Sequence, residues 1–387
     1  MSWSALEGVV VSPRSMSKPA PRALFASYSP LLGGAERLLL DYSTGMESAV
    51  VACPEGPLAR AARGAGLSVV VLSAQPLEFR RSLRDRIAAP ARIAMQAREL
   101  RRAIRWLRPE VVFGWSMRGL LVSAVAFRSL RARPALIFQH NDFLPPRQAA
   151  ARAVRAAARR SSRVVCLSRA IAEDLDPQGR LGDRMGVVHP GVDLSRFSPA
   201  PSPASSEALF LGAIVAWKRP DLALEVASLV ARSLPEFGLR VVGGPLGRPG
   251  EVLFEQLRRR GQRPDLHSRV RFDGPLPDPT AALRGAGCLL HCAEREPFGL
   301  ALVEALACGV PVIAPAAGGP CEIVDAGCGV LYPPGDAAAA AAALQDVLST
   351  PDRRARLAAG ARARAERLFD RERARADYRR LVSELGG

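Results

Sequence analysis

The feature that most constrains the fold of this chain is a regular alternation of short apolar runs with longer segments of helical periodicity. A strand that is apolar along its whole length is buried on both faces, so this alternation is typical of parallel sheets covered by helices. The first half is therefore predicted to be a doubly wound α/β unit. Its strands are expected at Ala23–Ser27, Ala49–Ala52, Ser68–Leu72, Val111–Trp115, Ala135–Gln139, Val164–Ser168 and Gly186–His189.

A proline- and serine-rich segment, SPAPSPASSE at residues 198–207, interrupts the pattern and is typical of a linker. We therefore expect two Rossmann-like domains facing a central cleft, at residues 21–197 and 208–368. A flexible tail at 1–20 and a C-terminal helix at 369–387, packing back toward the first domain, complete the chain. Strands of the second domain are predicted at Ala208–Gly212, Leu239–Val242, Val270–Asp273, Cys288–His291, Pro311–Ala314 and Val330–Tyr332.

One predicted helix, at residues 91–107, is apolar on one face and basic on the other. Pro90 is expected to mark its start, and Pro109 follows its end. The apolar stripe consists of Ile93, Ala97, Leu100, Ile104 and Leu107, and the opposite face carries Arg98, Arg101, Arg102, Arg105 and Arg108.

Positive charge is concentrated in the first half of the chain. Residues 1–200 contain 30 Lys and Arg against 15 Asp and Glu, whereas residues 201–387 contain 24 against 22. Two interpretations stay open: solvated helix faces in an arginine-rich protein, or attraction to anionic lipid. Nucleic-acid binding is disfavoured because few aromatic residues are interleaved. Besides the helix face, the basic clusters are Arg80, Arg81, Arg84, Arg86 and Arg92, and Arg147, Arg152, Arg155, Arg159 and Arg160.

Several locations are disfavoured by composition. No run approaches the ~20 apolar residues that a membrane-spanning helix needs. The N-terminus has a glutamate inside its short apolar run, which makes it a poor signal peptide. Seven cysteines without a C-x-x-C pair are typical of buried thiols in a reducing compartment. We expect a cytoplasmic protein, with the inner face of the cell membrane as the alternative location.

The most informative segment is HCAEREPFGLALVEALACGVPVIAP, at residues 291–315. It predicts a strand end, a loop and a helix that begins around Phe298–Leu300 and stops before Gly309. Exposed N–H groups at such a helix start can bind phosphate oxygens. Glu296 in the loop and Glu304 in the helix can accept hydrogen bonds from vicinal hydroxyls of a ribose or a sugar. The alternative is that both are ordinary solvated glutamates.

This segment resembles a known signature. EPFGLALVE, at residues 296–304, is similar to the E-x-F-G-x-x-x-x-E motif of the retaining glycosyltransferases of family 4, which have the two-Rossmann GT-B fold. Six further segments resemble motifs of that family in the same order: LLGGAERLL (31–39), VVCLSRAIAEDL (164–175), HPGVDLSRF (189–197), GAIVAWKRPDLAL (212–224), VVGGP (241–245) and GGPCEIVDAGCGVLYPPGD (318–336).

The resemblance implies roles for individual residues. Glu304 would hold the ribose hydroxyls of a nucleotide sugar, Glu296 would contact the donor sugar, and Lys218 would neutralise the leaving diphosphate. His140 would lie near the donor sugar, although a purely structural histidine is as plausible, and Asp142 is a weaker candidate. Backbone groups would complete the site: the amides of Phe298, Gly299 and Leu300, and the loop of Gly33 and Gly34.

One position departs from the family pattern. Ala213 stands where the family usually has an arginine that contacts the diphosphate. Loss of such a charge-assisted contact costs about 1.5–3 kcal/mol, which corresponds to roughly tenfold to a few hundredfold in rate or affinity. Arg219 is a candidate for compensation. No cluster with metal-ligand spacing is visible, and a phosphate site made of lysine and amides needs no divalent ion.

The resemblance thus implies a retaining glycosyltransferase that moves a hexose from a nucleoside-diphosphate sugar to an acceptor hydroxyl. A glycan or a lipid-linked acceptor is expected, together with an anionic membrane surface and no nucleic acid. Two alternatives stay open. One is a nucleotide-sugar epimerase or hydrolase of the same fold, and the other is a non-catalytic binding protein with a degenerate diphosphate site at Ala213.

Overall fold

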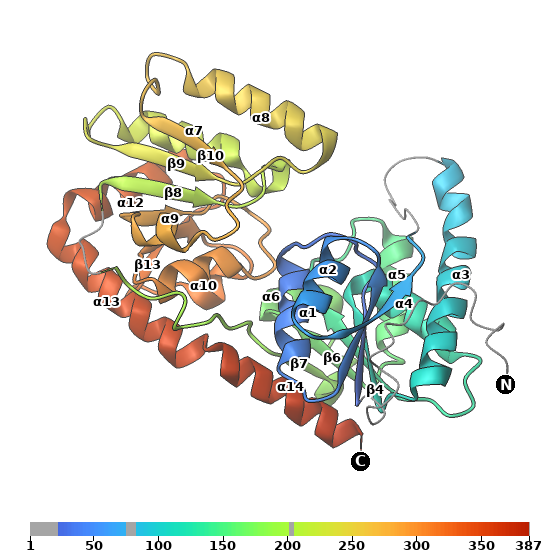
Figure 1. Cartoon of the computed structure of the whole chain (residues 1–387). Coiled ribbons are helices and arrows are strands. Elements are labelled where there is room, and N and C mark those ends of the chain that lie inside the picture. The colour runs from blue at the N-terminus through green and yellow to red at the C-terminus, as the bar shows by residue number, and fades with distance from the viewer. Residues whose placement is uncertain (1–21, 75–82, 201–204, 387) are drawn as a thin grey trace. The chain divides into compact units, whose positions relative to one another are not determined.

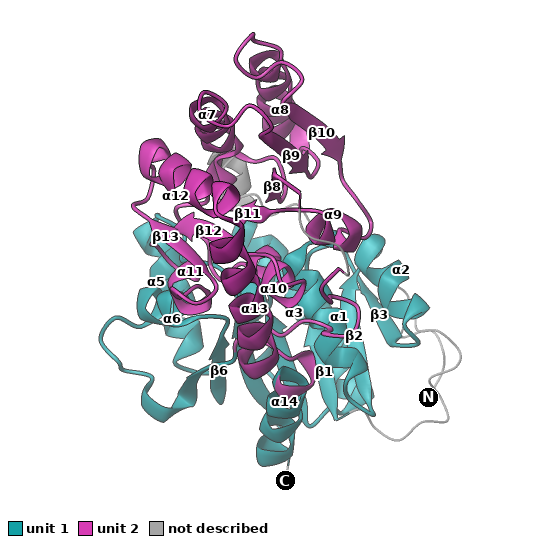
Figure 2. Ribbon diagram, turned by 90° about the vertical axis from the view of Figure 1, so that its left-hand side faces the viewer, with its two compact units in different colours: residues 1–188, 374–387 teal, residues 189–373 magenta. Residues whose placement is uncertain are grey.

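Two separate parallel sheets organise the chain (Figure 1). The computed structural model describes residues 22–74, 83–200 and 205–386, with the side chains of residues 83–88 outside the description. Unit 1 comprises residues 1–188 and 374–387, and unit 2 comprises residues 189–373 (Figure 2). The predicted tail at 1–20 lies outside the described residues.

Unit 1 is built on a seven-stranded sheet in the order β3-β2-β1-β4-β5-β6-β7, with every neighbouring pair parallel. The strands are β1 (Ala23–Ala26), β2 (Ala49–Pro54), β3 (Ser68–Leu72), β4 (Val111–Trp115), β5 (Ala135–His140), β6 (Arg163–Cys166) and β7 (Met185–Val187). The helices are α1 (Gly34–Thr44), α2 (Pro57–Gly64), α3 (Leu83–Leu107), α4 (Ser116–Phe127), α5 (Gln148–Ala158), α6 (Arg169–Leu175) and the 3-10 turn η3 (Gly182–Arg184).

Unit 2 has a six-stranded parallel sheet in the order β10-β9-β8-β11-β12-β13. The strands are β8 (Glu207–Leu211), β9 (Gly238–Val242), β10 (Val270–Gly274), β11 (Cys288–Leu290), β12 (Val312–Pro315) and β13 (Gly329–Tyr332). The helical elements are η4 (Ala216–Lys218), α7 (Pro220–Val230), α8 (Gly247–Gly261), α9 (Thr280–Arg284), α10 (Leu300–Ala307), α11 (Pro320–Ile323), α12 (Ala337–Ser349), α13 (Pro351–Leu368) and α14 (Arg371–Leu385), whose last twelve residues belong to unit 1.

The predicted α/β class and all thirteen predicted strands are confirmed, each strand within two residues at either end. The strand order reverses direction between β1 and β4 in unit 1 and between β8 and β11 in unit 2. Parallel sheets of this kind bind ligands outside the carboxyl ends of the strands, at the point where the order reverses. The loops that follow β1, β4, β8 and β11 therefore lie where sheets of this kind bind their ligands.

The division between the units falls earlier than the predicted linker. The segment His189–Phe197 belongs to unit 2 because its backbone pairs with that unit. The Val192 N–H donates to the Phe369 carbonyl at 2.8 Å, and the Arg371 N–H donates to the Val192 carbonyl at 3.1 Å. Within unit 1, Arg375 of α14 pairs with Asp41 at 2.6 Å, and Tyr378 stacks on Tyr42 at 3.9 Å.

Helix α3 corrects one prediction. The helix begins at Leu83, and Pro90 lies inside it rather than at its start. Proline inside a helix removes one hydrogen bond and crowds the carbonyl four residues earlier, which weakens or kinks the helix locally, but a helix can continue through it. Ala97, Leu100 and Ile104 are buried as predicted, whereas Ile93 and Leu107 are half-buried.

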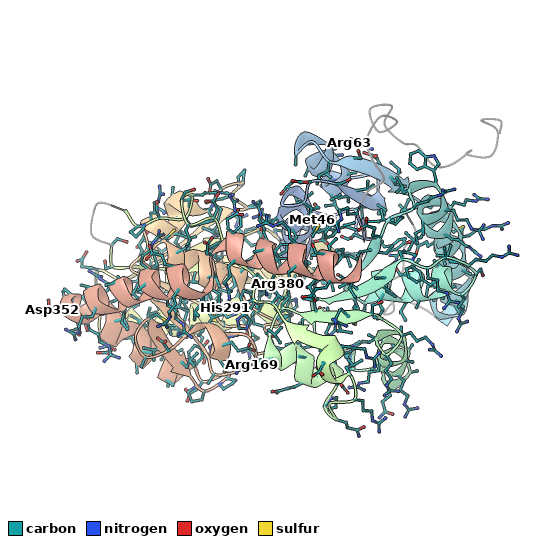
Figure 3. The ribbon with its side chains drawn as sticks, turned by 90° about the horizontal axis from the view of Figure 1, so that it is seen from below. Met46, Arg63, Arg169, His291, Asp352 and Arg380 are labelled. Carbon is teal, nitrogen blue, oxygen red and sulfur yellow. The ribbon has the colours of Figure 1, made fainter. Side chains whose placement is uncertain are left out.

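The basic face of α3 is exposed at Arg98, Arg102, Arg105 and Arg108, with Arg101 half-buried. Figure 3 shows long side chains with terminal nitrogens projecting outward from this helix. Of the other predicted basic positions, Arg80 and Arg81 lie outside the described residues, as do the side chains of Arg84 and Arg86. None of the described helices is long and apolar enough to cross a membrane.

Candidate functional site

The loop between β11 and α10 is formed by close backbone packing. Gly299 caps α10 with φ +115°, a conformation that residues with a side chain rarely adopt. Gly319 approaches so closely that an added Cβ would lie 2.2 Å from the Phe298 carbonyl oxygen. The Gly319 N–H also donates to the Glu296 carbonyl at 2.9 Å. The glycine pair of the segment 318–336 therefore holds the Glu296–Phe298 backbone in place.

A buried charge cluster lies at this edge of the unit 2 sheet. The Lys218 ammonium forms an ion pair with the Glu296 carboxylate, and the two side chains are 18% and 8% exposed. His291, labelled in Figure 3, follows β11 and places its Nε2 3.3 Å from the same Glu296 oxygen, without the alignment of a hydrogen bond. The structure thus brings together two residues that the sequence predicted and a third, His291, that it did not.

The cluster sets the protonation of its members. Burial would raise the pKa of the Glu296 carboxyl, but the charge of the nearby Lys218 ammonium outweighs burial and lowers that pKa to about 2. Burial lowers the pKa of His291. Glu296 is accordingly an ionised acceptor at neutral pH, beside a lysine cation and a neutral imidazole.

The start of α10 offers hydrogen-bond donors close to this cluster. Within the described chain, no hydrogen bond engages the backbone N–H groups of Gly299 and Leu300. The first N–H groups of a helix have no partner inside the helix and carry its positive dipole end. Phe298, which precedes them, is buried. Donors of this kind suit phosphate or sugar oxygens.

Lys218 is presented by the turn η4, which follows β8. Arg219 has φ +52° and directs its guanidinium to Asp221, at 3.0 Å, and to Glu294. Arg219 is thus engaged by two carboxylates of its own unit, and its compensating contact with a diphosphate stays a prediction. Ala213 is exposed at the start of the same loop, and nothing in its backbone prevents a longer side chain there.

Glu304 lies on the second turn of α10 and is half-buried. One turn later, burial raises the pKa of the Cys308 thiol to about 11, and the negative charge of Glu304 also raises it. Its assignment to ribose hydroxyls stays a prediction.

The predicted residues of unit 1 lie at the carboxyl ends of β1 and β5. Gly33 precedes α1 and donates its N–H to Glu36 at 3.0 Å, and Gly34 is the first residue of that helix.

His140 ends β5 and is fully buried, and burial lowers its pKa to about 3. Neither ring nitrogen has a hydrogen-bond partner among the described residues. A neutral, unsatisfied buried imidazole requires an explanation, and a ligand contact is one. Asp142 is exposed.

A polar chain that the sequence did not reveal runs beside His140. Tyr378 on α14 donates to the Gln139 side chain, which donates to Asn141 at 2.9 Å, which donates to the Ser116 hydroxyl at 3.2 Å. Ser116 has φ +65°, unusual for a residue other than glycine. No periodicity or motif marks these residues, because their pairing joins segments far apart in the chain.

Among the residues that the structure describes, no group of three or more His, Cys, Asp or Glu is arranged to hold a metal ion.

Comparison with known proteins identifies the family. The model for "Glycosyltransferase Family 4" matches residues 32–196, and that for "Glycosyl transferases group 1" matches residues 193–364. D-inositol 3-phosphate glycosyltransferase of Streptomyces scabiei is 38% identical over 202 residues, covering 48% of this chain and 45% of the relative. The enzyme of that name from Frankia alni is 37% identical over 223 residues, covering 51% and 54%. The chain spans about half the length of the curated relatives it matches.

Solved structures share the fold across nearly the whole chain. Anabaena Alr3699/HepE in complex with UDP superposes with a TM-score of 0.82 at 23% identity, covering 94% of this chain and 100% of that one. Sucrose-phosphate synthase from Thermosynechococcus elongatus gives 0.78 at 18% identity, covering 94% and 99%. Two Rossmann-like units with these matches define a GT-B protein. The chain belongs to the group 1 glycosyltransferases of family 4.

The low pKa of Glu296 makes a prediction about stability. A carboxyl whose folded pKa of about 2 lies below its ordinary 4.5 stabilises the fold above pH 4.5, and this contribution is lost as the pH falls toward 2. Glu296→Gln should therefore lower the free energy of unfolding by about 2–3 kcal/mol at pH 7. The difference from wild type should shrink between pH 5 and pH 3.5.

Chemical unfolding at each pH measures this difference, with Glu251→Gln on the exposed face of α8 as the control for loss of a surface charge. A difference between wild type and Glu296→Gln that stays constant with pH would contradict the ionised buried pair.

Proposed function

We propose that this protein is a retaining glycosyltransferase that transfers a hexose from a nucleoside-diphosphate sugar to an acceptor hydroxyl. The observation that carries the proposal is the buried Lys218–Glu296 pair beside the unengaged N–H groups of Gly299 and Leu300. Two further findings support it: the matched relatives are named glycosyltransferases, and Alr3699/HepE was solved with UDP and with UDP-glucose.

Each group has a role in the transfer. As the bond between the sugar and the diphosphate breaks, negative charge grows on the phosphate, where the Lys218 cation and the α10 N–H groups would stabilise it. The ionised Glu296 would accept hydrogen bonds from sugar hydroxyls and so orient the reacting carbon. The proposed step is a front-face displacement in which a leaving phosphate oxygen takes the acceptor proton. Glu296 is a positioning group here, because an ion-paired carboxylate is a weak nucleophile.

The remaining predicted residues complete the proposal. Glu304 would hold the ribose, and the Phe298 amide would act with the two N–H groups that follow it. The neutral His140 ring of unit 1 and the Gly33–Gly34 backbone would contact the donor. Because lysine and amide groups supply the positive charge, the reaction should need no metal cofactor.

The basic charge in the first half of the chain favours an acceptor that is negatively charged. Long-range attraction from such a surface raises the local concentration of anionic molecules. The relatives named D-inositol 3-phosphate glycosyltransferases indicate one chemical class, a phosphorylated polyol. A lipid-linked or cell-envelope glycan on an anionic membrane is the second class.

The exposed face of α3 favours membrane association. Met95 and Trp106 are 41% and 42% exposed, on the helix that also carries the exposed arginines. An apolar anchor flanked by arginine is typical of helices that lie at a lipid surface. Arg155 of the second basic cluster is not available to lipid in this way, since its guanidinium donates to the carbonyls of Asp174 and Leu175 at 2.8 and 2.9 Å.

The function is tested by binding and then by product analysis. A nucleoside-diphosphate sugar at 100 times its Kd should add about 2.7 kcal/mol of stability, measurable as a thermal shift across a panel of donors. The donor that binds is then incubated with inositol phosphate and with lipid-linked acceptors, and the anomeric configuration of the product is read by NMR. We expect the product to retain the anomeric configuration of the donor and the rate to be unchanged in EDTA. Glu296→Ala should reduce kcat by at least about a hundredfold.

Other outcomes would identify the alternatives. Release or epimerisation of the sugar without transfer would indicate a hydrolase or an epimerase. Binding without turnover across the acceptor panel would indicate a non-catalytic protein. Alanine in place of a diphosphate-binding arginine at position 213 is the observation behind this hypothesis.

Position 213 offers a gain-of-function prediction. Ala213→Arg restores a cation at an exposed position beside the Lys218 turn, so kcat/KM should rise about tenfold or more. Ala216→Arg, also exposed in the same loop, adds the same charge elsewhere and is the matched control. Steady-state kinetics on the donor measures both, and equal effects of the two substitutions would refute a specific phosphate contact at position 213.

If the protein associates with membranes through α3, its binding to anionic vesicles should depend on the charge of that helix. Replacing Arg98, Arg102 and Arg108 with Gln should reduce cosedimentation with vesicles of phosphatidylglycerol and phosphatidylcholine by about a hundredfold at low salt, at ~1 kcal/mol per arginine. Replacing the exposed Arg248, Arg258 and Arg259 of α8 with Gln removes the same charge from unit 2 and should have little effect. Absence of wild-type binding at low salt, where attraction is strongest, would overturn the proposal.

A further inference from the structure

Trp217 is an exposed aromatic residue in an unusual place. It lies in the turn η4, next to Lys218, and 49% of its surface is exposed. Its ring centroid lies 4.2 Å from the Lys218 ammonium nitrogen. A large apolar side chain with half its surface in water contributes little to the core, and the contact that Trp217 does make is with a charged residue of the site.

The Lys218 ammonium is held from two sides. The Glu296 carboxylate contacts it on one side and the indole face on another. A cation over an aromatic face is attracted by the negative face of the ring, and more strongly where water is excluded. The Lys218 side chain is 18% exposed, so most of its surface is shielded from water, whereas the indole beside it is half exposed.

This arrangement matters because neither position 213 nor Arg219 supplies an unengaged cation beside Lys218. Position 213 carries alanine, and the Arg219 guanidinium is engaged by Asp221 and Glu294. A lysine reaches its target on a flexible four-carbon stem, and ordering that stem costs conformational entropy. A contact that orders it in advance reduces the cost at the moment of binding.

We propose that Trp217 is a positioning residue for Lys218: its indole face holds the ammonium at the Glu296 carboxylate, ready for the diphosphate of the donor. The contact itself is independent of the reaction, whereas its consequence for transfer rests on the proposed function. Trp217 acts through Lys218 and is not itself a catalytic residue.

The chain offers a direct probe, because Lys18 and Lys218 are its only lysines. Protein labelled with ¹³C-lysine should give two Cε–Hε correlations by NMR, and Lys18→Arg assigns them. The ring current of the indole should shift the Lys218 Hε signals upfield in the ligand-free protein. Trp217→Leu should return them to ordinary positions, Trp217→Phe should keep part of the shift, and the Lys18 signal should not move. Unshifted Lys218 signals in the wild type would overturn the proposal.

Kinetics and nucleotide binding supply the second readout. Trp217→Leu should reduce both kcat/KM and UDP affinity about tenfold, and Trp217→Phe should stay within about threefold of wild type, because a cation over an aromatic face is retained. Val252→Ala removes an exposed apolar side chain elsewhere in unit 2 and should have no effect. Equal values for the Phe and Leu variants would show that shape alone matters and overturn the proposal.

The two hypotheses fail separately. If the wild type transfers no sugar, the proposed function fails. The NMR signals of Lys218 still show whether the Trp217 indole lies over its ammonium group. If the wild type is active and Trp217→Leu equals it, the positioning role fails while the proposed function stands.

Discussion

Both sheets are parallel and their central strands are buried on both faces, and the remaining features of each unit depend on this constraint. Strands β1, β4 and β12 are buried at every residue, so polar side chains are excluded from these three strands, and the polar site residues lie where the strands of each sheet end. In unit 2 the carboxyl ends of β8 and β11 lead to Lys218, His291 and Glu296. In unit 1 the ends of β4 and β5 lead to Ser116 and His140. The candidate site residues of each unit thus lie at strand ends because the buried strands exclude polar side chains.

Burial of charge decides the chemistry at these edges. An isolated buried carboxylate would be protonated or destabilising, but Glu296 is paired with Lys218, and its pKa falls to about 2. His140 has no such partner among the described residues, and burial lowers its pKa to about 3. One fold therefore holds an ionised acceptor, a cation and a neutral imidazole at neutral pH. The difference between the two buried groups lies in their partners, since Glu296 and His140 are both removed from water.

Prediction from sequence succeeded where a local pattern has one structural solution. Apolar runs located each described strand, and Gly299 and Gly309 bracketed α10 because both positions have positive φ, which glycine adopts without steric cost. It failed where tertiary contacts override local signals. Pro90 lies inside α3 although proline usually begins a helix, and residues 189–197 pair with the second unit although the proline-rich segment lies after them. His291, Asn141 and Tyr378 were missed because their partners lie far away in the chain.

The sequence by itself determined the α/β class, the two parallel units and the family, since these depend on periodicity and on motifs that are contiguous in the chain. It also named Lys218 and Glu296 without relating them. The tertiary structure decided that these two residues, 78 positions apart, form one buried ion pair, that Arg219 turns to Asp221 and Glu294, and that the Trp217 ring lies over the Lys218 ammonium. The physical reason is that ion pairing, burial and cation–π contacts act over a few ångströms in space, whatever the separation along the chain.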